Sequence, residues 1–296
     1  MNGKKRTQGS AGEPERRSGA GGVPRRVLVA LDAATLCAGA FDLAAEFARL
    51  FDADLSGLFI EDADLLHSAA LPFVRQFGFG SASGSSFDLK TIERELNLLA
   101  SKARNTLVAA AERRKLRHSF RVVRGQLASQ LALSSTEADL VVLQASSRPL
   151  GRHLRLEAPG LAAATALGCA VLLLEPGMGL PSSVLVALED GGGDERVLAL
   201  GAEIARLAGL ELRVLAPPLE PREAAKREAF LRKRLAEAHL AWRLEVLPAF
   251  DARAVAFYTR QHGQNLLVLS ASSSLLAEVE RDRLIATFRC PLLLIR

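Results

Sequence analysis

The chain has 296 residues, of which 49% are hydrophobic and only 5% aromatic, enough for two modest domains with aliphatic cores. The net charge of +5 equals that of the first 26 residues, which carry seven basic and two acidic side chains, so the rest is neutral. This distribution argues against a nucleic-acid partner for the folded part. No apolar stretch approaches the ~20 residues of a membrane span, so we expect none.

Residues 1–24 are rich in glycine, serine and basic side chains, a composition typical of a disordered, solvated tail. Weak tethering to nucleic acid or an anionic surface is the alternative for this tail. Arg25 and Arg26 precede an apolar run, as in an export signal, but Asp32 interrupts the run and the run recurs internally without basic residues. The three cysteines include no CxxC pair, which indicates packing in a reducing compartment, and we expect a cytoplasmic location.

Apolar periodicity predicts strands that alternate with helices along the first half. An apolar strand, VLVALD (27–32), precedes a buried helix over 41–51 and a strand at 55–60. Residues 61–86 are irregular, either a partly docked flap or an ordinary surface excursion. A long amphipathic helix then runs from Asp88, an expected N-cap, to the basic residues 113–115. The remaining elements are strands at 119–124, 139–143 and 171–174, and helices at 127–133 and 159–168.

The pattern restarts after a Pro/Gly linker at 176–181. VLVALE (184–189) repeats VLVALD, and NLLVLSASS (265–273) repeats DLVVLQASS (139–147). A charged helix from Pro221 should bury Ala224, Leu231, Leu235 and Ala238. The other second-half elements are helices at 194–208 and 251–258, and strands at 212–215, 242–246, 266–269 and 292–295. Strands that alternate with helices through short links indicate parallel sheets covered on both faces.

This order of elements, with an acid after the first strand and an apolar last strand preceded by Cys169 or Cys290, resembles the universal stress protein (UspA-like) family. The resemblance implies two tandem doubly wound α/β domains, 25–178 (with the flap 61–86) and 179–296. Each would be a Rossmann-like five-stranded parallel sheet of order 3-2-1-4-5. It also implies pairing through the last strands, within the chain or in a homo-oligomer such as a dimer.

Family members that bind ATP carry an acid after the first strand and a G-x2-G-x9-G-(S/T) loop after the fourth. Asp32 keeps the acid, and Glu189 is its counterpart in the second half. The loop departs from the pattern, because Gln144, Ser147 and Glu157 fall on the glycines and Ala158 on the hydroxyl residue. Each change removes backbone freedom or a phosphate donor, and Glu157 adds a negative charge. We therefore expect that the phosphate site is lost or altered.

Two alternatives stay open for the first-half loop. Cations could replace the glycines as an anion site, or a shifted register could use Gly151 and Gly160. The cations in question are Arg148, Arg152, His153 and Arg155, which a solvated loop would equally explain. If the first domain binds ATP or another anion, the residues in contact with it should be Asp32, Ala145, Ser146, Ser147, Arg148 and Arg152.

The corresponding second-half segment, 270–282, has no glycine and three acids, so we expect its serines to cap a helix and this half not to bind ATP. The five histidines show no metal-ligand spacing, and no serine lies in a G-x-S-x-G context. We therefore expect no metal, no cofactor and no catalysis. The predicted function is that of a stress-response or regulatory protein acting through binding and contacts with a protein partner that the sequence does not identify. The alternative is a nucleotide or anion sensor, or a slow ATP hydrolase, using the first-half cleft.

Overall fold

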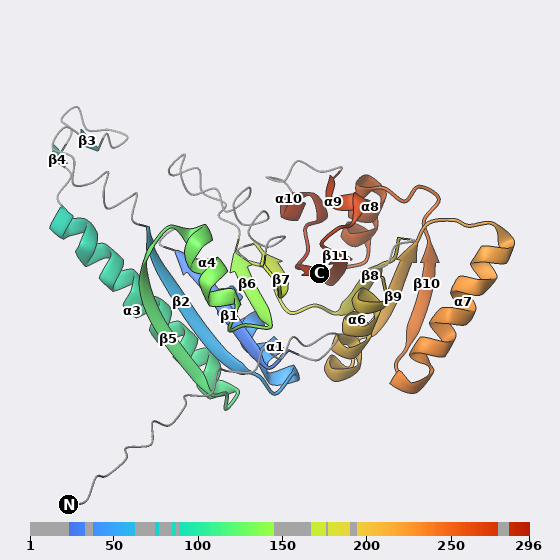
Figure 1. The fold of residues 1–296 in the computed structure, drawn as a ribbon, viewed down its shortest axis with the longest axis horizontal. Helices are drawn as coiled ribbons and strands as arrows, with labels where there is room; N and C mark the ends of the chain where they lie inside the picture. The colour runs from blue at the N-terminus through green and yellow to red at the C-terminus, as the bar shows by residue number, and fades with distance from the viewer. Residues whose placement is uncertain are drawn as a thin grey trace, which may run out of the picture.

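The computed structural model describes residues 24–32, 38–62, 75–76, 85–86, 89–144, 167–175, 177–189, 194–277 and 284–296. Most described strands belong to one mixed sheet of ten strands that runs through the whole molecule (Figure 1). Two short strands, β3 (Arg75–Gln76) and β4 (Ser85–Ser86), pair antiparallel with each other. The chain therefore has an α/β fold with a single large sheet.

The first half of the chain contributes five parallel strands in the spatial order β5-β2-β1-β6-β7. The inner strands are apolar and buried, as expected for parallel strands covered on both faces. The strands are β1 (Arg26–Asp32), β2 (Asp54–Asp62), β5 (His118–Gly125), β6 (Leu140–Gln144) and β7 (Ala170–Leu174).

The second half contributes five more parallel strands in the order β10-β9-β8-β11-β12. Numbered in chain order within its own half, each set of five strands reads 3-2-1-4-5. The strands are β8 (Ser183–Ala187), β9 (Glu211–Ala216), β10 (Trp242–Val246), β11 (Asn265–Ser270) and β12 (Leu292–Ile295).

The halves meet where β12 pairs antiparallel with β7, with Leu292 opposite Leu173 and Leu294 opposite Val171. The predicted pairing through last strands thus occurs within the chain. Since β7 also pairs with β6, and β12 with β11, neither strand keeps an open edge. A homo-oligomer formed through these strands, the other expectation, is therefore not compatible with this sheet.

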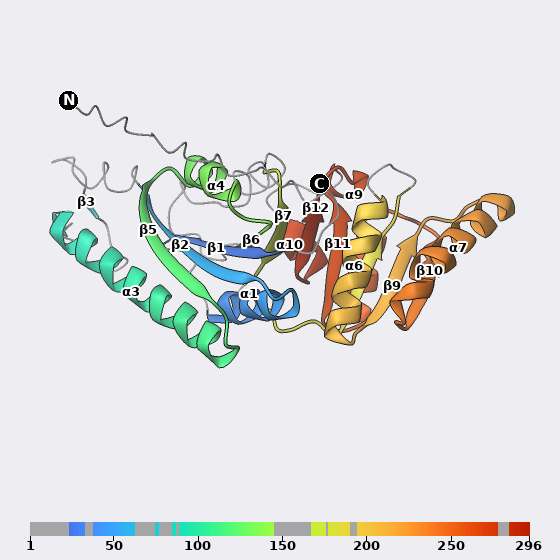
Figure 2. The same ribbon diagram turned by 60° about the horizontal axis from the view of Figure 1, so that its bottom comes forward.

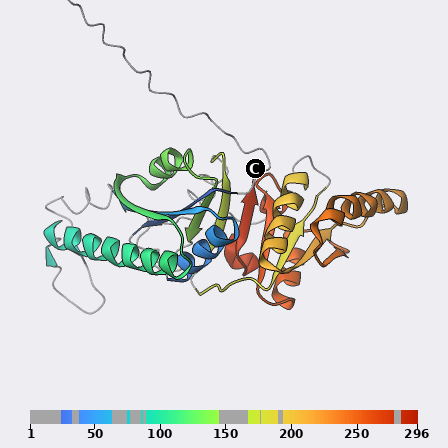
Figure 3. The same cartoon turned by 90° about the horizontal axis from the view of Figure 1, so that it is seen from below.

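Helices cover both faces of the sheet. Figure 2 shows α4 on the opposite side of the first-half strands from α1 and α3, and Figure 3 shows the two halves side by side along the long axis. The helices packed on the α1 side are α1 (Ala38–Leu50), α3 (Leu89–Arg113), α6 (Asp194–Ala208) and α7 (Pro221–Leu235). Those on the other side are α4 (Leu127–Ser135), α8 (Ala252–Gln261), α9 (Ser274–Ala277) and α10 (Leu284–Phe288).

Each face of the sheet carries one continuous aliphatic core that includes both halves. Val27 and Val184 belong to the core on the α1 side, whereas Leu28 and Leu185 belong to the core on the α4 side. Cys290 is buried in the α4-side core and Cys169 packs against it, as predicted from their apolar surroundings. The two halves therefore share their hydrophobic burial.

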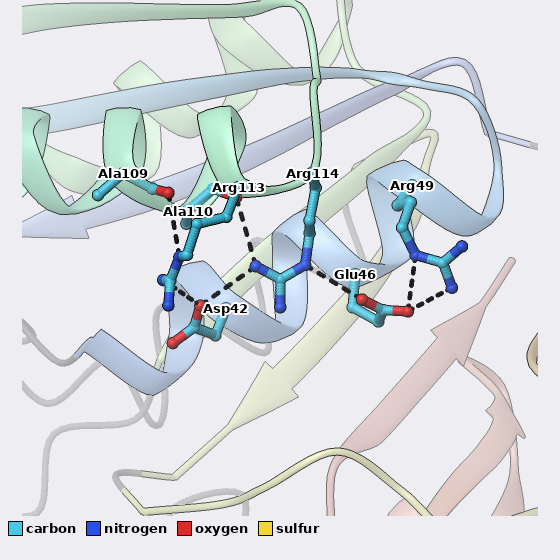
Figure 4. A network of polar contacts seen from close by, with 7 residues as sticks. All are labelled: Asp42, Glu46, Arg49, Ala109, Ala110, Arg113 and Arg114. Atoms are coloured by element: carbon cyan, nitrogen blue, oxygen red, sulfur yellow. Dashed lines mark hydrogen bonds and ion pairs between the residues drawn. The ribbon is translucent and has the colours of Figure 1, made fainter.

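Ion pairs fasten α1 to the end of α3 (Figure 4). Asp42 accepts hydrogen bonds from Arg113 (2.8 Å) and Arg114 (3.3 Å), and Glu46 accepts one from Arg114 at 3.1 Å. Arg49, one turn after Glu46, donates to it from Nε at 2.9 Å. The hydrogen bond from Arg49, with a second from Arg114, lowers the pKa of the Glu46 carboxyl below its usual value.

Several predicted boundaries change in the structure. Strand β2 continues through Glu61 and Asp62, because these residues pair with Arg124 and Gly125, so the predicted flap begins later. Ala224 is exposed, whereas Leu231 and Leu235 are buried as predicted. The tail 1–23, most of the flap and the predicted helix 159–168 fall almost entirely outside the described residues. Within the described ranges, no helix is long and apolar enough to cross a membrane.

Candidate functional site

The carboxyl ends of β8 and β11 form the edge of the second half where the family cleft is expected. These strands are parallel neighbours, so both chains leave the sheet at the same edge. Leu188 extends the pairing of β8, donating its N–H to Leu215 O at 2.9 Å, and Glu189 follows it. Beyond β11 a short turn leads to Ser273 and then to α9. Glu189 and the start of α9 are thereby brought to the switch point of the strand order.

The Glu189 carboxylate binds the start of α9. Ser273 Oγ donates to Glu189 Oε1 at 2.5 Å, and the Ser274 N–H donates to Oε2 at 2.9 Å. The Leu275 N–H contributes a longer hydrogen bond of 3.4 Å to Oε1 and donates also to Ser273 Oγ at 3.2 Å. Ser273 is buried and Glu189 half-buried. One carboxylate of the chain thus occupies the donors at this end of the sheet.

The Glu189 carboxylate takes the place that an external anion would have at the start of α9. Backbone N–H groups at the start of a helix are donors suited to an anion. Here the anion is the side chain of Glu189, whose position is set by the preceding strand. The prediction that serines of this segment cap a helix is confirmed for Ser273, which accepts the N–H of Leu275.

In the first half, the structure leaves the corresponding site residues largely undescribed. Asp32 is the last residue of β1 and pairs in register with Ile60, but its side chain lies outside the described residues. The predicted contact residues Ala145, Ser146, Ser147, Arg148 and Arg152 also lie outside them. Their role stays a prediction.

Gln144 is the residue at this edge that the sequence prediction did not single out for its own chemistry. It ends β6, pairs with Leu174 and has a side chain only 3% exposed. Its amide Oε1 is buried without a hydrogen-bond partner among the described residues. A buried acceptor without a partner is costly. The signal in the sequence is the polar residue that ends an otherwise apolar strand, DLVVLQ.

The described residues bear on two kinds of reactive site, a metal site and an activated thiol. No cluster of three or more metal-ligating side chains occurs in the part of the chain that the structure describes. Burial raises the pKa of the Cys169 thiol to about 11 and that of Cys290 to about 12. Both thiols are therefore protonated at neutral pH and unsuited to nucleophilic attack.

The sequence matches no family model and no curated protein. Solved structures with similar folds include a universal stress protein from Archaeoglobus fulgidus DSM 4304, with 10% identity, a TM-score of 0.65, and coverage of 91% of this chain and 98% of that chain. A putative universal stress protein from Pseudomonas aeruginosa UCBPP-PA14 has 19% identity, a TM-score of 0.55, and coverage of 92% and 93%.

A functionally unknown protein from Pseudomonas aeruginosa PAO1 has 17% identity, a TM-score of 0.53, and coverage of 92% of each chain. At such identities the likeness concerns the fold. It extends over about nine-tenths of the chain and therefore includes both halves of the sheet. The chain has the fold of the universal stress proteins.

Proposed function

We propose that the chain is a tandem universal stress protein-like regulator that acts through binding and protein contacts rather than catalysis. Its two UspA-like domains would be residues 25–178 and 179–296. The equal strand order of the halves and the fold likeness across the whole chain support this division. We propose a stress-response role and a cytoplasmic location on the same basis.

The observation that carries the proposal is the contact between Glu189 and the start of α9. Ser273 Oγ and the N–H groups of Ser274 and Leu275 all donate to one carboxylate. A nucleotide phosphate placed there would lose these donors and would face the negative charge of Glu189. We infer that the second domain does not bind ATP in the manner of its family, and that no nucleotide cofactor is held there.

Calorimetric titration of the whole chain with ATP, ADP and AMP tests this proposal. The expected result is that no micromolar site requires Glu189, so that Glu189→Ala leaves any measured affinity unchanged or raises it by releasing the donors of Ser273, Ser274 and Leu275. Micromolar binding that is abolished by Glu189→Ala would contradict the proposal. The variant Asp32→Ala probes the first half in the same experiment, because loss of binding in that variant alone places the ligand in the first-half cleft.

A second candidate function, a nucleotide or anion sensor using the first-half cleft, is favoured by Gln144. Its buried amide oxygen, without a partner among the described residues, lies at the end of β6 and beside β1. A ligand with an N–H or O–H donor would satisfy it. In this function Asp32, Arg148 and Arg152 would contact the ligand, with slow ATP hydrolysis as its enzymatic form.

The variant Gln144→Leu separates the two functions. If Gln144 serves a ligand, nucleotide affinity falls in the variant, whereas the thermal stability of the free protein stays equal or rises. If the first half has lost its ligand, the variant is stabilised and nucleotide titration gives the same result as for the unaltered chain.

A further inference from the structure

A cavity of about 200 Å³ lies at the amino ends of β1, β2 and β5, at the opposite end of these strands from the expected nucleotide cleft. Its volume is below the roughly 300 Å³ at which sites for larger ligands begin. Three hydroxyl residues line it, Ser56 of β2, Ser119 of β5 and Ser134 of α4. Ser56 Oγ and Ser119 Oγ are 3.0 Å apart, and Ser134 is only 6% exposed. The cavity is thus small and partly enclosed, and its lining combines these hydroxyls with apolar surface.

The register explains why the cavity opens in the first half. Across the sheet, Leu28 pairs with Ser56, and Ser56 pairs with Ser119. The corresponding row of the second half pairs Leu185 with Arg213, and Arg213 with Arg243.

In that second-half row, both guanidinium groups reach Glu211, each with a nitrogen 2.8 Å from a carboxylate oxygen. Long ion-paired side chains therefore occupy the row in the second half, and serines replace them in the first.

Charged groups also line the cavity. Arg121 of β5 lies 3.4 Å from Glu137, and both side chains are substantially exposed. Arg26 contributes a second cation. Asp54 pairs in register with Arg26, but its carboxylate is 2.7 Å from Arg117 Nε. Two arginines thus face the cavity with one carboxylate, Glu137, and the hydroxyls add neutral donors.

We propose that this cavity binds a small oxyanion of the size of phosphate, held by Arg121, Arg26 and the serine hydroxyls. Guanidinium groups and hydroxyls are the donors that suit tetrahedral oxyanions. Water alone would fill a cavity of this size with about seven molecules at roughly 30 Å³ each. The site is independent of the proposed function, because it lies among β1, β2 and β5 of the first half, whereas Glu189 follows β8 of the second half.

Calorimetric titration of the whole chain with inorganic phosphate at low salt tests the site, with Arg121→Gln as the variant and Arg124→Gln as its matched control. Arg124 is on the same strand and loses the same charge, but its side chain binds Glu61 and lies near Glu93 of α3 on the other face. The affinity should fall about tenfold or more in Arg121→Gln and stay within about twofold in the control. Equal losses in both variants, or no saturable binding up to about 50 mM phosphate, would overturn the proposal.

Ser119→Leu provides a second test, because it replaces a hydroxyl of the cavity lining by a larger, uncharged side chain. The side chain should fill part of the cavity and weaken phosphate binding while the far-ultraviolet circular dichroism is unchanged. An unchanged phosphate affinity in a folded Ser119→Leu variant would contradict the site. A parallel titration with glycerol phosphate distinguishes a free ion from the phosphate group of a small ester, and saturable Arg121-dependent binding of either one supports the proposal.

Discussion

The two halves of the chain share a strand order but satisfy their polar groups differently. Before the fourth strand of the first half, Asp139 accepts the backbone N–H groups of Arg25 and Arg26 at 2.9 and 3.1 Å. In the second half, Asn265 begins the fourth strand. Its side chain accepts a hydrogen bond from Ser183 Oγ and donates to Thr259 O and Gly263 O. The apolar rows that build the sheet are kept in both halves, whereas the groups at the strand ends are specific to each.

The helices after the first strands show the same contrast. Helix α6 pairs Glu203 with Arg206 through the spacing that α1 uses for Glu46 and Arg49. However, Ala199 of α6 stands where α1 carries Asp42. The bond between helices instead joins Glu195 of α6 to Arg234 of α7 at 2.7 Å, beside a groove of about 510 Å³ between these helices. The local pair is retained at the same spacing, whereas the bond between helices has moved to other residues.

The largest expected effect on stability comes from exchanging the polar residues at the start of the fourth strand of each half, Asp139 and Asn265. In Asn265→Asp, a buried carboxylate would replace the amide that donates to two carbonyl oxygens at 3.0 Å each. The free energy of unfolding should fall by about 4 kcal/mol at pH 7. The reverse exchange, Asp139→Asn, keeps an acceptor for both N–H groups and should cost below about 1 kcal/mol. Urea unfolding measures the loss of stability in both variants. Equal losses would show that Asp and Asn are interchangeable at these two positions.

The next effect concerns the junction of the halves. Leu293 of β12 pairs with Leu172 of β7 and is 1% exposed, so Leu293→Ala should cost about 3 kcal/mol. Because both cores include residues of both halves, we expect one cooperative transition shifted to lower urea. The control, Leu180→Ala, changes a half-exposed leucine and should cost below about 0.5 kcal/mol. Two transitions of which only one shifts would instead indicate independently folding domains.

The smallest effect comes from the ion pairs of α1. Glu46→Gln should lower the free energy of unfolding by about 1 kcal/mol at pH 7, since Glu46 binds both Arg49 and Arg114. The pKa of Glu46 is lowered in the folded protein, so its contribution is complete above the unfolded pKa and is lost as the pH falls through the folded one. Below about pH 4.5, the free energy of unfolding should therefore fall less steeply with decreasing pH in the variant than in the unaltered chain.

Glu203→Gln is the matched change in α6, where the carboxyl pKa is also lowered but its hydrogen bond comes from Arg206 of the same helix. Its effect should be smaller than that of Glu46→Gln. An equal or larger effect would show that the bonds from α3 contribute nothing to stability.

The sequence was sufficient to predict the strands of each half, because buried parallel strands are continuous apolar runs and the second run repeats the first. The strand order was implied only by the family resemblance, and the joining of all ten strands into one sheet was one of the two ways of pairing that it left open. Ser273 could be predicted as a helix cap from its position before an apolar turn. The contact between Ser273 and Glu189 could not be predicted, since it depends on two loops that meet at the edge of the sheet. The cavity beside Ser56 and Ser119 was also beyond the sequence, because it depends on cross-strand register. The contacts of Asp32 and of residues 145–152 stay predictions.

A crystal structure of the whole chain grown with ATP and Mg²⁺ tests the central contrast most directly. We expect the Glu189 carboxylate to remain bound to Ser273 Oγ and the Ser274 N–H, with no nucleotide at the ends of β8 and β11. A nucleotide at that edge, with its phosphates on the N–H groups of α9 and Glu189 turned away, would contradict the account.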